Sequence, residues 1–248
     1  MTLFYFTTTG NSLALARTFS SSPRSIVAEL RSDGAGEGFV YRDPEAIGVV
    51  CPVYFGDLPL PVREWLARTR FETPYTFLLL TCGNTPGLAV GKALEIMPFD
   101  YADCLVTVDN YFPMYDVAVQ VRDLPRKHVG QQTEALRTDI LARRRGHRRP
   151  GLYDRIAALY MRLRPLSPVA YRNFYILDDR CTRCGLCARI CPAGNISHGR
   201  DGLPEIGSAC MTCGACRHAC PASAIRYRGE KSTYQYRHPD VTLRDLLP

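Results

Sequence analysis

The sequence predicts an α/β protein in which a doubly wound, five-stranded parallel sheet is followed by a small α+β domain. Three observations support this prediction. Residues 1–143 alternate between short apolar runs and stretches with helical spacing. Several of these runs are apolar throughout, which is typical of parallel strands that are covered on both faces. Finally, eight cysteines are concentrated between residues 181 and 220.

The alternating part of the chain contains five predicted strands and four predicted helices. Successive strand–helix units of this kind form an open sheet with right-handed crossovers, whose ligands bind beyond the carboxyl ends of the strands. Apolar and β-branched residues predict the strands at 3–7, 25–30, 47–54, 75–81 and 104–109. Apolar residues at helical spacing predict the helices at 12–19, 61–70, 88–97 and 129–143.

The rest of the chain divides into three further parts. A connector at 144–175 is rich in arginine and contains a predicted amphipathic helix at 152–163. For this helix, packing between two domains is favoured over lying on a membrane surface, and the membrane alternative stays open. The complete division is 1–143 for the sheet domain, 144–175 for the connector, 176–228 for the cysteine-rich domain and 229–248 for a tail.

Composition restricts the class of protein. The net charge is +7, but residues 122–172 alone hold 13 Lys/Arg and 4 Asp/Glu, so the excess belongs to one segment. This argues against nucleic-acid binding, which needs a basic stripe on the folded domains. The sequence has no long apolar run and no secretory signal, which predicts a cytoplasmic protein. Eleven cysteines in a reducing compartment indicate metal binding rather than disulfides.

Eight of the cysteines lie in an internal repeat. CTRCGLCARICPAGNI at 181–196 and CMTCGACRHACPASAI at 210–225 share eight of sixteen positions at an offset of 29 residues. Each has the spacing C-x2-C-x2-C-x3-C followed by proline, which is the spacing of bacterial ferredoxins with two 4Fe–4S clusters. The repeat therefore predicts a ferredoxin-like domain of two similar halves. Structural zinc is the alternative, although its cysteine pairs are usually separated by longer gaps.

The fourth cysteine of each run is expected to bind the cluster of the other run. Three thiols two residues apart surround one cluster, whereas the fourth begins a turn that points away from it. Cluster I is therefore predicted on Cys181, Cys184, Cys187 and Cys220, and cluster II on Cys210, Cys213, Cys216 and Cys191.

The other chemically distinctive side chains are expected to be structural. Cys51, Cys82 and Cys104 lie in or beside predicted strands, where a thiol packs as a small hydrophobe. Trp65 is expected in the core of its helix. His218, inside the second cysteine run, is expected to be a solvated surface residue.

A second motif lies in the turn after the first strand, which reads Thr7-Thr8-Thr9-Gly10-Asn11-Ser12. Hydroxyls and backbone amides ahead of a helix can bind a phosphate group, assisted by the helix dipole. The loop has no lysine, so it is not a nucleotide-hydrolysing P-loop, and it lacks G-x-G-x-x-G. A plain N-cap on Asn11 or Ser12 is the alternative without a ligand.

This loop resembles the phosphate loop of the flavodoxin family, T/S-x-T-G-N-T/S, and follows the first strand as it does there. The resemblance implies a flavodoxin-like domain with FMN as its ligand, the phosphate lying on residues 7–12. It also implies that loops after the third and fourth strands hold the flavin ring. Tyr54 is favoured as the ring that stacks on the flavin, and Phe55 is the alternative. The implied contact residues are Pro52, Val53, Tyr54, Phe55, Gly56, Thr81, Cys82, Gly83 and Asn84.

The order of the parts resembles the flavodoxin–ferredoxin fusion family of anaerobic bacteria and archaea over nearly the whole chain. The resemblance implies an electron-transfer iron–sulfur flavoprotein that passes electrons between two 4Fe–4S clusters and FMN. Its redox partner would be a ferredoxin or another oxidoreductase. The direction of electron flow, the redox potentials and the formation of a homodimer stay open.

Two other functions also stay open. A flavin-dependent reductase fed by the clusters would bind a small organic substrate, and Tyr111, Phe112 and Tyr115 are candidates for its pocket or for the core. A redox sensor would lose its clusters reversibly and signal to a partner without turnover. No catalytic residue is assigned, and no Ser-His-Asp or paired-carboxylate arrangement suggests hydrolysis.

Overall fold

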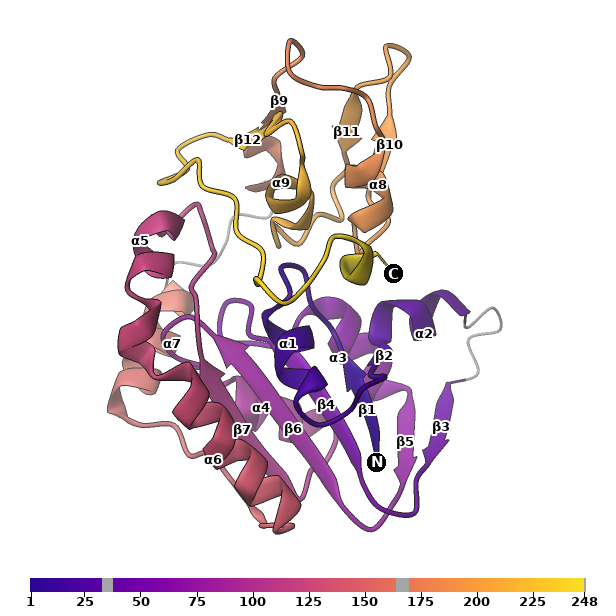
Figure 1. The fold of residues 1–248 in the computed structure, drawn as a ribbon, viewed down its shortest axis with the longest axis vertical. Coiled ribbons are helices and arrows are strands. Elements are labelled where there is room, and N and C mark those ends of the chain that lie inside the picture. Colours follow the sequence, from indigo (N-terminus) through magenta and orange to yellow (C-terminus); the bar gives the residue numbers. More distant parts are fainter. Residues whose placement is uncertain (33–37, 164–169, 248) are drawn as a thin grey trace. The chain divides into compact units, whose positions relative to one another are not determined.

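A computed structural model describes residues 1–32, 38–163 and 170–247, and the chain divides into two compact units (Figure 1). Residues 164–169 of the predicted connector, with its prolines 165 and 168, lie outside the described residues. Unit 1 comprises Met1–Thr7, Asn11–Thr107 and Leu124–Pro165, and unit 2 comprises Thr8–Gly10, Val108–Asp123 and Leu166–Pro248.

Unit 1 contains a six-stranded sheet in which every neighbouring pair is parallel. The predicted α/β class is confirmed, and the five predicted strands become six. The strand order is β2-β1-β4-β6-β7-β8. Without the two-residue β8, this is the order of flavodoxin-like sheets, which reverses between β1 and β4. The strands are β1 (Thr2–Tyr5), β2 (Arg24–Ser25), β4 (Ile47–Pro52), β6 (Thr76–Cys82), β7 (Tyr101–Val106) and β8 (Gly146–His147).

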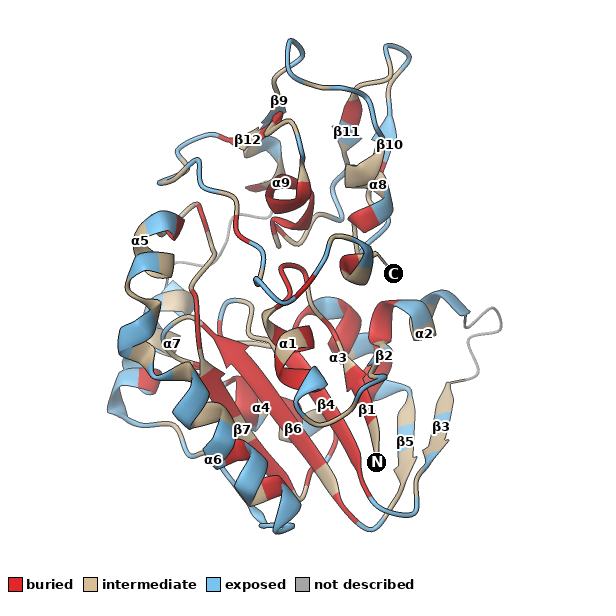
Figure 2. Cartoon of the chain, in the orientation of Figure 1, coloured by how far each residue is buried: buried red, intermediate tan, exposed pale blue. Residues whose placement is uncertain are grey.

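Helices cover both faces of this sheet, whose central strands are buried over most of their length (Figure 2). Leu3 and Phe4 are neighbours in β1 and therefore point to opposite faces. Leu3 packs in a core with Leu15 of α1 and Leu136 of α6. Phe4 packs against Trp65 of α3, which is fully buried as predicted. The helices of unit 1 are α1 (Asn11–Arg17), α2 (Ile26–Ser32), α3 (Leu60–Ala67), α4 (Ala89–Ile96), η1 (Leu124–Lys127), α6 (Val129–Leu141) and α7 (Leu152–Leu163).

Several parts of unit 1 differ from the sequence prediction. The strand predicted at 104–109 begins three residues earlier, because β7 spans Tyr101–Val106. The strand predicted at 25–30 is wrong, because β2 ends at Ser25 and α2 follows at once. Periodicity cannot separate a strand from a buried helical turn in so short an apolar run. The sequence prediction also lacks β3 (Phe39–Arg42) and β5 (Thr69–Glu72), which form a separate parallel pair. Since β5 begins at Thr69, the helix predicted at 61–70 ends early.

Unit 2 is built on the cysteine repeat, and its two strand pairs are antiparallel. No helix in the described part of the chain is long and apolar enough to cross a membrane. The elements of unit 2 are α5 (Val117–Arg122), η2 (Ala170–Asn173), β9 (Phe174–Ile176), α8 (Leu186–Ile190), β10 (Ile196–His198), β11 (Pro204–Ile206), α9 (Ala215–Ala219), β12 (Ile225–Tyr227) and η3 (Arg244–Leu246). Strand β10 pairs with β11, and β12 pairs with β9.

The two halves of the repeat have the same local backbone, as the repeat predicts. Gly185 and Gly214 precede α8 and α9 with φ of 71° and 72°. Cys191 and Cys220 end these helices with φ/ψ of −66°/115° and −65°/113°. A residue without a Cβ adopts a left-handed φ readily. This explains why both halves of the repeat have glycine at this turn.

Gly48 gives a test of the packing in unit 1. It lies in β4 between Leu3 and Phe77, and a Cβ there would overlap the Phe77 ring and lie 2.5 Å from Leu3 Cδ1. Gly48→Ala should therefore lower the free energy of unfolding by about 1–3 kcal/mol, measured by urea denaturation. The matched control is Gly91→Ala in α4, where nothing lies within 4 Å of the added Cβ. The control should be stabilised by about 0.5–1 kcal/mol, and equal effects of the two substitutions would contradict this packing.

Candidate iron–sulfur and flavin sites

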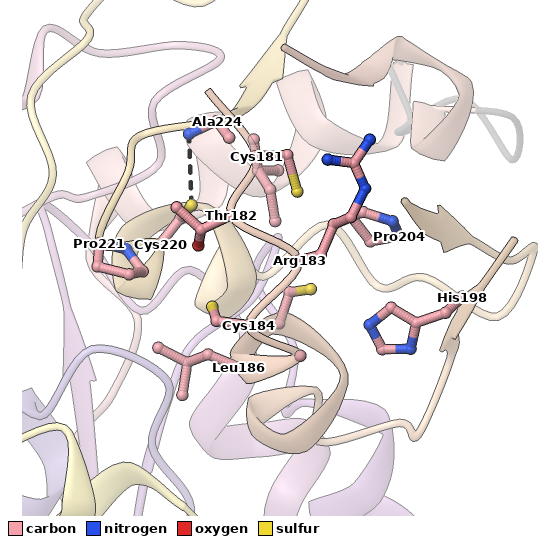
Figure 3. Close-up of a pocket in the computed structure, with 13 residues that line it drawn as sticks. Cys181, Thr182, Arg183, Cys184, Leu186, His198, Pro204, Cys220, Pro221 and Ala224 are labelled. Carbon is pink, nitrogen blue, oxygen red and sulfur yellow. Dashed lines mark hydrogen bonds between the residues drawn. The ribbon is translucent and has the colours of Figure 1, made fainter. Parts of the chain in front are cut away.

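Unit 2 contains a first cavity whose lining includes four cysteines (Figure 3). The Cys220 Sγ accepts a hydrogen bond from Ala224 N at 3.3 Å, which leaves the thiol at the wall of the cavity. Arg183 and His198 also belong to the lining and were not identified from the sequence. The four cysteines are Cys181, Cys184 and Cys187 from the first run and Cys220 from the second.

A second cavity has the complementary set of four cysteines. Cys191 Sγ accepts a hydrogen bond from Asn195 N at 3.4 Å, the repeat equivalent of the bond at Cys220. The lining otherwise consists largely of apolar side chains, among them Phe174 and Met211. The four cysteines are Cys210, Cys213 and Cys216 from the second run and Cys191 from the first.

The donor set of both cavities fits a 4Fe–4S cluster, which is held by four cysteine thiolates. Each cavity draws three thiols from one run and one from the other. Within the described ranges, no three side chains of His, Cys, Asp or Glu are arranged to hold a single metal ion.

Burial and backbone amides control the ionisation of these thiols. Burial raises the pKa of Cys213 to about 12 and raises the pKa of Cys216 well above its ordinary value. At the exposed Cys184, a hydrogen bond with the backbone N–H of Leu186 lowers the thiol pKa. Binding of iron requires thiolates, so a cluster in the second cavity must displace protons from these two buried thiols.

A buried arginine fixes the helix that carries part of the second run. Arg217 in α9 is only 1% exposed, and its Nε donates to Glu230 Oε2 at 2.8 Å. Its Nη1 donates to Tyr234 O at 2.9 Å, and its guanidinium carbon lies 4.6 Å from the centre of the Phe112 ring. Burial lowers the pKa of Arg217 and the Glu230 carboxylate opposes this effect, so the guanidinium stays charged.

The prediction of a surface position for His218 is wrong. Its Nδ1 accepts a hydrogen bond from Tyr236 N at 3.1 Å, so Nε2 carries the proton that is donated to Asn110 O at 3.0 Å. Burial lowers the pKa of His218 to about 3, which keeps the ring neutral at pH 7. Its two partners are 18 and 108 residues away, so local sequence gives no sign of them.

Phe112 is also a buried residue. It is 1% exposed, and its ring packs edge-on against Phe174 and Tyr227. Of the three aromatic residues considered for a substrate pocket, Phe112 therefore belongs to the core of unit 2, and Tyr111 and Tyr115 are partly buried.

The predicted phosphate loop follows β1 at the sheet edge where β4 and β6 also end, because these three strands are neighbours and parallel. Ser12 Oγ and Thr81 Oγ1 are both buried and lie 2.8 Å apart. The start of α1 therefore contacts the end of β6 directly. Thr7 and Asn11, on either side of the loop centre, are partly buried.

The centre of this loop, Thr8–Gly10, packs within unit 2. Thr9 O accepts a hydrogen bond from His238 N at 2.8 Å, and Thr9 Oγ1 accepts one from Asn110. Gly10 has φ +101°, and a Cβ at this position would lie 2.9 Å from Val241 Cβ. The C-terminal tail is thus fixed to the loop by contacts that its sequence does not predict.

The loop after β4 is a tight turn. Tyr54 and Asp57 exchange backbone hydrogen bonds of 2.8 and 3.0 Å, and Phe55 and Gly56 between them both have positive φ. Of these two central residues, Phe55 is exposed and Gly56 is buried. Tyr54 is partly buried, with its ring 6.3 Å from that of Phe6. Pro52 ends β4, and Val53 N donates to Thr81 O at 2.9 Å.

The loop after β6 is held by a lysine that was not identified from the sequence. Lys127 Nζ donates to Gly83 O at 2.6 Å and to Thr107 O at 2.7 Å. Asn84, next in the loop, is exposed. Cys82 is buried beside Cys104 with their sulfurs 3.1 Å apart, and Cys51 is buried too, so the prediction of core positions for these three thiols is confirmed.

Comparison with protein families identifies one part of the chain. Residues 180–225 match the family described as 4Fe-4S dicluster domain. The match spans all eight cysteines that line the two cavities and supports iron–sulfur clusters and electron transfer as the chemistry of this segment. A comparison with curated proteins finds no match.

The pair formed by Arg217 and Glu230 gives a test of how the second run is held. Glu230→Gln leaves the arginine buried without its counter-charge, which should lower the free energy of unfolding of unit 2 by about 3 kcal/mol. The change should be seen as a lower urea midpoint for loss of the cluster absorbance. Glu205→Gln, at an exposed position of β11, is the matched control and should change the midpoint little. Equal midpoints for both variants would show that the buried pair does not stabilise the unit.

Proposed function

We propose that the protein is an electron-transfer iron–sulfur flavoprotein that passes electrons between two 4Fe–4S clusters and FMN. One observation carries the proposal: a segment similar to dicluster domains shares its chain with a sheet of flavodoxin-like strand order, whose first loop reads TTTGNS. When bound, FMN supplies the exchange between two-electron and one-electron transfers. The fusion keeps the centres at a high effective concentration for each other.

The chemistry of the loops fits FMN. Residues 7–12 offer four hydroxyls for a phosphate group, and hydroxyl donors suit a phosphate. The loops with residues 52–56 and 81–84 begin at the same sheet edge, which is where ligands of such sheets bind. The contact between Ser12 and Thr81 supports this assignment, because it brings the first loop to the end of β6. We propose these three segments as the FMN contacts, with Tyr54 favoured for stacking on the flavin.

The ligand assignment of the clusters follows the two cavities. We propose that cluster I is bound by Cys181, Cys184, Cys187 and Cys220, and cluster II by Cys210, Cys213, Cys216 and Cys191. The linings of the two cavities support this exchange of the fourth cysteine between the runs. A ferredoxin or another oxidoreductase is the proposed redox partner, because ferredoxin-type domains commonly transfer electrons to such proteins.

The flavin part of the proposal is tested by binding. The protein purified without oxygen should contain about one FMN per chain, as expected for one phosphate loop. Thr8→Val removes a buried hydroxyl at nearly constant shape and should weaken FMN binding about tenfold, while leaving riboflavin binding unchanged because riboflavin has no phosphate. Flavin fluorescence titration measures both affinities. Thr138→Val, on the exposed side of α6, is the control. Absence of flavin binding, or equal losses for FMN and riboflavin, would contradict the assignment.

The cluster part is tested by cysteine substitution. The intact protein should hold about eight irons per chain, and its reduced form should give the EPR signals of two clusters. Cys191→Ser should perturb the same signal as Cys216→Ser, and Cys220→Ser the same signal as Cys184→Ser. Cys187→Ser is the informative comparison, since it lies in the run of Cys191 but should perturb the other cluster. If Cys191→Ser and Cys187→Ser perturb one common signal, the fourth cysteines do not cross.

A further inference from the structure

Helix α7 of unit 1 has its apolar side chains on the outside. Six large apolar residues of this twelve-residue helix are between 54% and 76% exposed. At 100° per residue they occupy one continuous arc of about 120° along a helix about 18 Å long. The six are Leu152, Tyr153, Ile156, Leu159, Tyr160 and Leu163.

The opposite side of α7 holds the helix on unit 1 by specific contacts. Asp154 is buried and accepts hydrogen bonds from Thr85 Oγ1 and from Gly151 N. Met161, two turns later, lies over Gly56 and Gly87, where its Cε would be 2.8 and 3.4 Å from an added Cβ. Turning the helix to bury its apolar arc would break the Asp154 contacts and leave a carboxylate without its partners. The apolar arc therefore faces outward as part of the folded state of unit 1.

Positive charge adjoins the arc. Residues 143–162 contain seven arginines, of which Arg144, Arg145 and Arg148 form ion pairs with acidic residues of unit 1. The one acidic residue of this range, Asp154, is buried. Arg155 and Arg162 are exposed and follow one border of the arc, while Tyr153 and Tyr160 form the other border. Within the described part of the chain, neither Arg155 nor Arg162 forms an ion pair. Leucine and isoleucine in the middle, with arginine and tyrosine at the borders, match a helix that lies in the interface of an anionic bilayer.

We propose that α7 docks the protein on anionic lipid surfaces, with the apolar arc in the headgroup boundary and the arginines on the phosphates. A lipid surface explains the arc and its charged border together. An acidic protein partner would account for the arginines, but it would not by itself require a continuous strip of aliphatic side chains flanked by tyrosines. The helix is too short to span a bilayer, so it lies on the surface.

The proposal is tested by sedimentation of the full-length, cluster-loaded protein with vesicles. The protein should bind vesicles that contain a quarter phosphatidylglycerol in phosphatidylcholine, and bind pure phosphatidylcholine and high-salt samples more weakly. Ile156→Asp with Leu159→Asp should lower binding more than tenfold. Arg155→Ala with Arg162→Ala should lower binding to the anionic vesicles roughly 10- to 30-fold at low salt, at about 1 kcal/mol for each arginine.

Val40→Asp is the matched control, because Val40 is an apolar residue of β3 that is 54% exposed. It should bind vesicles like the unchanged protein. Iron content and circular dichroism identify variants that have not folded, and Ile156→Ser with Leu159→Ser replaces the aspartate pair if that pair is unfolded. Vesicle binding that is absent, or unchanged in the arc variants, overturns the proposal. The proposal is also overturned if the samples do not bind vesicles and ultracentrifugation or cross-linking shows that a second copy of the chain or unit 2 covers the arc.

Discussion

The ion pair between Arg217 and Glu230 is the interaction on which the organisation of unit 2 depends. A five-residue helix such as α9 has no stability of its own, so tertiary contacts must hold it. Burial of the guanidinium makes those contacts obligatory, since a charge removed from water needs partners for its donors. Glu230 and Tyr234 O provide them, which brings the chain after the repeat back over α9. Gln235 then donates to Cys220 O at 2.7 Å, so the fourth cysteine is held by the same segment.

The two halves of the repeat have the same local backbone, but the residues around their two cavities differ. Cys191 and Cys220 have nearly the same dihedral angles and each accepts a hydrogen bond from the amide four residues ahead. Yet Arg183 and His198 line the first cavity, whereas the second has mainly apolar neighbours. Cluster potentials depend on nearby charge, hydrogen bonds and solvent exposure. Duplication therefore fixes the geometry of two similar sites, while the residues outside the motif are free to set two different potentials.

Features that depend on residues close together in the sequence could be predicted, whereas features that depend on distant residues could not. The cysteine spacing lies within short segments, so the two thiol sets could be foreseen, and long apolar runs located β4 and β6. The sequence predicts a strand at 25–30 where helix α2 forms, because a short buried segment carries no decisive period. The burial of His218 is not predictable from nearby residues, because its hydrogen-bond partners come from distant parts of the chain. The hydrogen bond between Thr9 and the tail could not be predicted for the same reason, since no local pattern indicates a contact across more than 200 residues.

Helix α7 shows that amphipathicity fixes the existence of a helix but not the side that it buries. Its bounds agree with the pattern, and a helix usually turns its apolar stripe toward the core. Here the buried side is chosen by one carboxylate and by close approach to two glycines, Gly56 and Gly87, where Met161 fits. The aliphatic side chains on the other side then contribute nothing to the core of unit 1. Exposed apolar surface of this kind favours association, so its continuity and its arginine border are best explained by a binding surface.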